Sequence, residues 1–207
     1  SPIGSNNRAM PTFAVIKPFG MLCQFTPESG HPALGELGDF PREVYPIGRL
    51  DRDSEGLLLL TDDNRLKRFV LEGAGGRKLW KTYHVQVEGA PNEEDLRAFE
   101  RPMELKAKGK VFVTRPARAR LLPPDHVPPW ERTPPIRFRA NIPTTWIEVQ
   151  LDEGKNRQVR RMTAAIGYPT LRIIRHAIGG LDLSLFEAAA KPTSAALDAA
   201  ALDLLKA

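Results

Sequence analysis

The sequence predicts an α+β fold with a mainly antiparallel mixed sheet and flanking helices. Three observations lead to this prediction. Short extended segments outnumber helical ones, the helical segments do not alternate strictly with strands, and 42% of the 207 residues are hydrophobic. A chain of this length and composition can bury one substantial core. We therefore expect one catalytic unit.

The N-terminal part of the chain alternates extended segments with turns. Thr12–Ile16 is apolar enough for a strand, which Pro18 and Gly20 end because proline cannot donate to a ladder and glycine permits a turn. Two more short strands are expected at Val44–Ile47 and Leu57–Thr61. The loop between them, residues 48–56, is dense in charge.

The middle of the chain contains the clearest period-two pattern. Thr82–Val87 places its aromatic and aliphatic side chains on one face, which predicts a strand with one buried face. Asn92 can cap a short helix that has Asp95 in its first turn. Further strands are expected at Lys110–Thr114, Ala117–Leu122, Thr145–Leu151 and Leu171–Ile174.

Two helices and one long loop complete the predicted organisation. Asn156–Ile166 is amphipathic, and Gly167 ends it. Ser194–Leu205 is rich in alanine and predicts a terminal helix. The proline-rich segment at about 123–143 contains Trp130 and predicts an ordered, functional insertion. We divide the chain into a disordered tail or cloning remnant (1–11), a catalytic domain (12–190) and a C-terminal helix (191–207).

The charge and the cysteine content narrow the function classes. Lys and Arg outnumber Asp and Glu by 30 to 25 and the pI is about 9.5, which favours a polyanionic partner, with nucleic acid the leading candidate. The single cysteine, Cys23, cannot form an internal disulfide, and no Cys/His cluster has zinc spacing. The longest apolar run, Leu57–Leu60, is far below the roughly 18 residues of a membrane span. We expect a cytoplasmic protein without a metal.

The loop around Asp51 is the strongest candidate for chemistry. Its glycine-bounded carboxylates precede an apolar strand that can hold them rigidly. A charged surface turn would have the same composition, and Asp51, Asp53 and Glu55 all remain candidates.

Arginines and one tyrosine are the other candidates, each with a structural alternative. Arg157, Arg160 and Arg161 share one helix face, which can bind phosphate or simply face solvent. Tyr83 can stack on a base or fill the core. Lys17 and Lys81, like the neighbouring Lys78, are candidates for contact with phosphate.

Four segments together resemble a known family. Residues 48–61 resemble the signature of the RsuA family of bacterial ribosomal RNA pseudouridine synthases, whose catalytic aspartate follows Arg-Leu. Lys17-Pro18 with Gly20 resembles the family's first motif, residues 81–85 its second and residues 153–162 its third. Most members begin with an S4 RNA-binding domain, which does not fit here, so the resemblance is to members without it.

The resemblance implies an isomerase that converts a uridine of 23S ribosomal RNA to pseudouridine on the pseudouridine synthase fold. The reaction involves no redox change, so no cofactor is expected. Asp51 would be the catalytic carboxylate, Tyr83 would stack on the flipped base and take the proton from carbon five, and Arg160 would keep Asp51 ionised. Arg49 would fill the gap left by the flipped nucleotide. The other residues expected to bind RNA are Lys17, Lys81, Lys155, Arg157 and Arg161.

Two alternatives belong to other classes. A catalytically silent assembly factor on the same fold would also bind ribosomal RNA, but a carboxylate facing phosphates would weaken simple binding. A glycosidase needs a second acid with a partner role, and none is evident. We expect a monomer that does not associate with membranes.

Overall fold

The computed structural model describes residues 10–187 and 194–207. Most of the predicted tail, residues 1–9, and the predicted boundary at residue 190 lie outside this range. The strands are β1 (Thr12–Lys17), β2 (Tyr45–Pro46), β3 (Glu55–Thr61), β4 (Lys81–Glu88), β5 (Glu104–Ala107), β6 (Lys110–Val113), β7 (Arg118–Leu121), β8 (Thr144–Leu151), β9 (Thr170–Ile178), β10 (Leu181–Asp182) and β11 (Ser194–Ala196). The α-helices are α1 (Asn64–Glu72), α2 (Glu93–Leu96), α3 (Gln158–Ala165) and α4 (Ala199–Leu204).

The described strands form one large mixed sheet and a separate hairpin. The large sheet has the order β11-β1-β3-β9-β4-β8-β7, with β2 paired to β3 and β10 to β9, while β5 pairs with β6. Its pairings are antiparallel except for the parallel contact of β3 with β9. The predicted α+β class is therefore confirmed. No helix in the described ranges has the length and hydrophobicity to cross a membrane.

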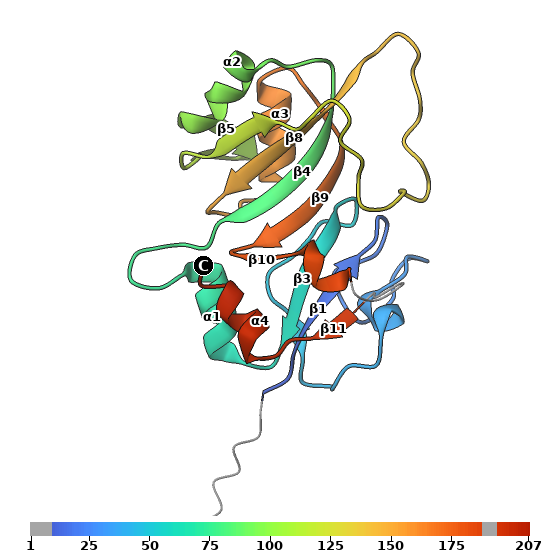
Figure 1. Ribbon diagram of the computed structural model, residues 1–207, viewed down its shortest axis with the longest axis vertical. Helices are drawn as coiled ribbons and strands as arrows, with labels where there is room; N and C mark the ends of the chain where they lie inside the picture. Colours follow the sequence, from blue (N-terminus) through green and yellow to red (C-terminus); the bar gives the residue numbers. More distant parts are fainter. Residues whose placement is uncertain (1–9, 188–193) are drawn as a thin grey trace, which may run out of the picture.

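The sheet joins two halves of the molecule (Figure 1). One half contains β4, β8 and β9 with α2 and α3, and the other contains β1, β3 and β11 with α1 and α4. The halves meet where β3 runs beside β9. Gly56 is required where these two strands pair, because its φ is +113° and a Cβ would lie 2.4 Å from the carbonyl oxygen of Arg175.

β3 is the most buried strand of the sheet, since all seven of its residues are buried. Leu57 and Leu59 pack into the apolar cluster beneath α1 and α4. Leu58 and Leu60 pack into a second cluster on the other face. Burial on both faces explains why this strand is a continuous apolar run, and it gives the preceding loop a rigid support.

The β4 half has its own core. Val85 and Val87 of β4 pack against Val159 and Met162 of α3, on the face that the alternating pattern predicted. The short helix α2 begins with the expected capping box of Asn92 and Asp95 and continues as a 3-10 turn.

The predicted terminal helix over Ser194–Leu205 is wrong in its first half. Ser194–Ala196 forms β11, which pairs with β1 at the edge of the sheet, and only Ala199–Leu204 is helical. The side chain of Asp198 caps this helix by accepting from the N–H of Ala201, which fixes a helix start at Ala199, five residues later than predicted. Helix α1 and strand β5 were not predicted.

Candidate active site

A cavity of about 760 Å³ lies between the two halves of the molecule. The loop that contains Asp51 and the helix α1 form one wall, whereas β4, β8 and the segment leading into α3 form the other. Of the predicted site residues, Arg49, Asp51, Lys81, Tyr83, Lys155, Arg157 and Arg160 line it.

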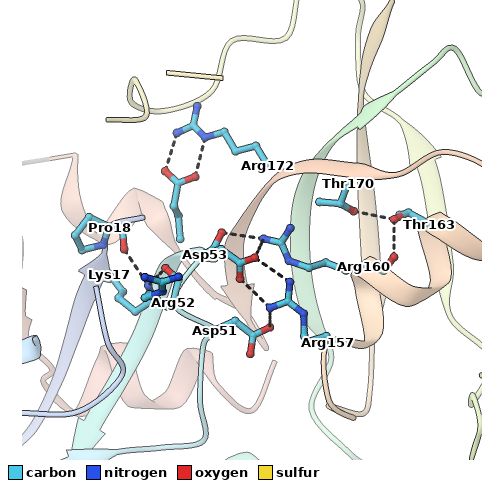
Figure 2. Close-up of polar contacts among 11 residues, drawn as sticks. Lys17, Pro18, Asp51, Arg52, Asp53, Arg157, Arg160, Thr163, Thr170 and Arg172 are labelled. Atoms are coloured by element: carbon cyan, nitrogen blue, oxygen red, sulfur yellow. Dashed lines mark hydrogen bonds and ion pairs between the residues drawn. The ribbon is translucent and has the colours of Figure 1, made fainter. Parts of the chain in front are cut away.

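The loop between β2 and β3 is fixed by hydrogen bonds to its own backbone. The N–H of Ser54 donates to the carbonyl of Asp51 at 2.9 Å and closes a tight turn. The carbonyl of Arg52 accepts from the N–H of Gly20 at 2.8 Å. It also accepts from Lys17 Nζ at 3.2 Å, and Figure 2 shows Lys17 beside Arg52. Together with the buried β3, these bonds present Asp51 on a rigid support.

The side chain of Arg157 bridges the two aspartates of the loop, Asp51 and Asp53 (Figure 2). Its Nη1 lies 3.3 Å from Oδ2 of Asp51. The same guanidinium donates to both carboxylate oxygens of Asp53, at 3.0 and 2.8 Å. Arg157 has a left-handed backbone at the N-cap of α3, with φ of 51°, so the chain bends at the residue that reaches the loop.

Arg160 contacts Asp53 rather than Asp51. Its Nη2 donates to the carbonyl of Asp53 at 2.8 Å and lies 3.6 Å from Oδ2 of that residue. The direct pairing of Arg160 with Asp51, implied by the family resemblance, is therefore not made in this structure. Arg157 makes that contact instead.

Burial and neighbouring charges have opposite effects on the pKa of Asp53, which forms a charged cluster with Arg157 and Arg160. Partial burial favours a raised pKa for Asp53, but hydrogen bonds from Arg157 and the charge of Arg160 outweigh it and lower the pKa below its usual value. Burial also lowers the pKa of Arg160, which remains a cation at neutral pH because arginine starts so high. The cluster thus holds two arginine charges beside the cavity.

Tyr83 belongs both to the core and to the cavity wall. It is 9% exposed and packs with the apolar cluster under α3, while also lining the cavity opposite the Asp51 loop. The core interpretation and the stacking interpretation are therefore compatible.

The predicted RNA contact of Lys17 is contradicted by its burial. Its side chain is fully buried, and Nζ donates to the carbonyls of Pro18, Met21 and Arg52. Burial lowers its pKa to about 8. A buried ammonium with three protein acceptors has no donor to offer a phosphate, so Lys17 braces the loop that contains Asp51.

Arg161 also has a structural contact. Its Nε and Nη2 donate to Asn156, and its Nη1 donates to the carbonyl of Lys106 at 2.8 Å. It does not line the cavity; instead it ties the hairpin of β5 and β6 to α3. Lys108, at the tip of that hairpin, lines the cavity.

Sequence reasoning missed Arg175 of β9. This arginine is 4% exposed, lines the cavity and donates from Nε to the carbonyl of Leu57 at 2.8 Å. Among the described residues its buried Nη2 has no partner. The available signal was an arginine following two isoleucines in an apolar strand, where a charge needs a reason. Its charge, after burial, contributes to lowering the pKa of Lys81 to about 8.

The proline-rich insertion is anchored to the first residue of β3, directly after the loop that contains Asp51. Glu55, the first residue of β3, is 1% exposed and forms a two-bond ion pair with Arg172 of β9, at 2.8 and 2.9 Å. Trp130 of the insertion donates its indole N–H to Glu55 at 2.8 Å, and its carbonyl accepts from Arg172. The insertion is thus ordered at this point, as expected.

Comparison with known proteins places these features in context. The family model described as RNA pseudouridylate synthase matches residues 11–165. The chain is 48% identical to ribosomal large subunit pseudouridine synthase E of Vibrio vulnificus, over 81% of this chain and 68% of that protein. The protein of the same name from Xanthomonas axonopodis pv. citri is 50% identical, over 79% of this chain and 83% of that protein.

More distant likenesses concern the fold. Ribosomal large subunit pseudouridine synthase B of Bacillus subtilis is 34% identical, over 83% of this chain and 62% of that protein. A crystal structure of a pseudouridylate synthase superposes with a TM-score of 0.73 at 24% identity, covering 95% of this chain and 74% of the other. An H/ACA ribonucleoprotein bound to a substrate RNA gives a TM-score of 0.52 at 14% identity, covering 84% and 49%.

Proposed function

The chain belongs to the RNA pseudouridylate synthase family, whose members are isomerases, and we propose that it converts a uridine of 23S ribosomal RNA to pseudouridine with Asp51 as the catalytic carboxylate. The substrate class rests on the names of the relatives, which are large-subunit synthases. We place the reaction in the bacterial cytoplasm and expect the protein to act as a monomer.

One observation carries the assignment of Asp51. The predicted loop segment 48–56 contains three acids, of which Asp51 is the one that lines the cavity. Asp53 is turned towards Arg157 and Arg160, and Glu55 is buried against Arg172. Asp51 and Asp53 keep similar fractions of their side chains exposed, 36% and 34%, but Asp51 contacts one arginine whereas Asp53 contacts two. It is therefore the acid of the loop that an incoming nucleotide can reach.

The reaction breaks the bond from N1 of uracil to C1′ of ribose, turns the base and joins C5 to C1′. The hydrogen on C5 leaves as a proton and N1 ends protonated, so atoms and electrons balance without a redox partner. A uridine must leave its stack to enter the cavity, at a cost of a few kcal/mol. Phosphate contacts with the basic side chains that line the cavity offset this cost. We assign this role to Arg49, Lys81, Lys155 and Arg157.

The ionised form of Asp51 is the useful one, as nucleophile or as base at the sugar. A carboxylate that loses water tends to take up a proton, and the adjacent guanidinium of Arg157 opposes this. Arg160 supports the arrangement by holding Asp53. To Tyr83, which lines the opposite wall of the cavity, we assign stacking on the turned base and acceptance of the proton from C5.

Release of tritium tests the proposal. Unmodified 23S RNA is transcribed with uridine that carries tritium at C5 and is incubated with the purified protein. Only isomerisation displaces that atom, so the proposal predicts tritium in the water in a fixed, small molar ratio to RNA. Tight binding of the RNA with no release would instead favour the silent assembly factor.

A further inference from the structure

A second cavity, of about 820 Å³, lies behind the active site. Thr82 of β4 and Gln150 of β8 line it, whereas their neighbours Tyr83 and Leu151 line the first cavity. Successive residues of a strand point to opposite faces of a sheet. The two cavities therefore lie back to back, at the same end of the same two strands.

The chemistry of the second cavity is cationic. Its basic side chains are Arg77, Lys78, Arg115, Arg118 and Lys206, and Asp152 is the one acidic side chain in its described lining. Asp152 accepts two hydrogen bonds from Arg115, both at 3.0 Å, so that charge is already neutralised. Lys206 lies 3.7 Å from Asp203. Three exposed cations, Arg77, Lys78 and Arg118, form no ion pair within the described residues.

An aromatic platform lies among these charges. The guanidinium carbon of Arg118 lies over the ring of Trp80, 4.7 Å from its centroid, in a cation–π contact. The carbonyl of Trp80 accepts from the N–H of Gly179 at 2.8 Å, which fixes the backbone of Trp80 beside the end of β9. A Cβ at Gly179 would lie 2.4 Å from the carbonyl oxygen of Leu205, so this wall is closely packed.

We propose that this second cavity binds an unpaired segment of the same RNA, flanking the nucleotide that enters the active site. The inference rests on the proposed function. A concave surface that combines unpaired cations with a planar stacking group is the pattern by which proteins hold single strands. The cations contact phosphates, and an unpaired base stacks on the guanidinium of Arg118 or on the ring of Trp80.

Matched charge variants test the proposal. The variant Arg77→Ala/Lys78→Ala/Arg118→Ala removes three cations of the cavity. The control, Arg42→Ala/Arg65→Ala/Arg101→Ala, removes three exposed cations that line neither cavity. Binding of unmodified 23S transcript is measured by filter retention over a series of salt concentrations, and tritium release is measured at saturating RNA. Thermal melting establishes that each variant is folded.

The cavity variant should bind at least about tenfold more weakly at moderate salt, with a slope of log affinity against log salt smaller by about 2, since each single-strand phosphate contributes about 0.7. Its rate at saturating RNA should match the wild type, and the control should lose little affinity. Equal losses in both variants would overturn the proposal, because they would reflect net charge alone.

Arg118→Lys separates stacking from charge. It keeps the cation but loses the planar group, so affinity should fall several-fold while the salt slope stays unchanged. Wild-type affinity in this variant would overturn the stacking contact. A wild-type protein that binds RNA through these residues but releases no tritium would count against the proposed isomerisation and leave the second site intact.

Discussion

Lys17 illustrates how burial changes the role of a charged residue. The sequence places it at the end of an apolar strand beside a turn, a position that suits an exposed phosphate contact equally well. The structure buries it against three carbonyl groups, one of which belongs to the Asp51 loop. The burial follows from tertiary packing, which no local pattern around Lys17 encodes.

Lys17→Met should therefore damage the loop rather than RNA binding by charge. The carbonyl of Met21 loses its donor, whereas the carbonyls of Arg52 and Pro18 keep the N–H groups of Gly20 and Met21. A buried group left unsatisfied costs about 1–3 kcal/mol. We expect a lower melting temperature and a reduced rate of tritium release, with an unchanged salt dependence of RNA affinity. A salt slope smaller by about 1, without a change in melting, would instead identify Lys17 as a phosphate contact.

Tyr83 serves as core residue and cavity wall, and its hydroxyl separates the two roles. Tyr83→Phe conserves volume and stacking, so the protein should fold and bind RNA as the wild type does. If the hydroxyl accepts the proton from C5, tritium release should stop. Tyr83→Ala should also lose stacking, worth about 1–3 kcal/mol. Filter binding and tritium release on the same RNA measure both effects; a Phe variant that releases tritium at the wild-type rate rules out the proton-acceptor role.

Lys81 predicts a pH dependence of RNA binding. Burial and the nearby charge of Arg175 lower its pKa to about 8. A bound phosphate favours the charged form, so affinity should be full below this pKa and decline as the pH rises through about 8. Lys81→Arg stays charged and should show a flat profile. If the Arg variant declines in the same window as the wild type, another group, such as Lys17, is responsible.

At the scale of elements, the sequence predicted the strands better than the helices. Alternation in β4 and the apolar run of β3 survive in the structure because burial on one or both faces is what their patterns record. Helix α1 was missed although Leu66, Phe69 and Val70 have helical spacing. Four of the nine residues of α1 are charged, and they interrupt the apolar pattern that would have indicated a helix.

The terminal segment shows the limit of propensity. Alanine favours helix, but the free edge of β1 offers Ser194–Ala196 a ladder of hydrogen bonds, and that pairing prevails.

The active site also depends on tertiary packing that the sequence does not record. The motifs indicated Asp51, Tyr83 and the helix that carries the arginines, whereas the partner of each arginine depends on how that helix docks on the loop. Arg157 rather than Arg160 reaches Asp51 for this reason.

The proline-rich insertion should stabilise the catalytic loop through Trp130. Trp130→Phe removes the indole donor to Glu55, a hydrogen bond to a charged group worth about 1.5–3 kcal/mol. The melting temperature should fall by roughly 3 to 12 °C. Glu131→Gln, an exposed change in the same segment, serves as the control and should melt like the wild type. Equal melting of both variants would show that the insertion does not support the loop.

At the scale of the whole molecule, the sheet has two halves (Figure 1). The residues that line the cavity come from both. The loop that carries Asp51 comes from one half, while Tyr83, Arg157 and Arg160 come from the other. The predicted family is confirmed by the match over residues 11–165 and by relatives that are 48% and 50% identical. Because the residues of the site come from both sides of the β3–β9 pairing, neither half alone contains it.

The most direct test of this account is tritium release by Asp51→Asn, measured beside Asp53→Asn and the wild type on the same C5-labelled 23S transcript. The amide keeps the shape of Asp51 but removes an anion from a phosphate-binding cavity. RNA affinity should therefore be equal to or higher than that of the wild type, while release falls to background. Asp53→Asn loosens Arg157 and Arg160 and should lower the rate without abolishing it. Measurable release by folded Asp51→Asn protein would contradict the assignment of the catalytic carboxylate.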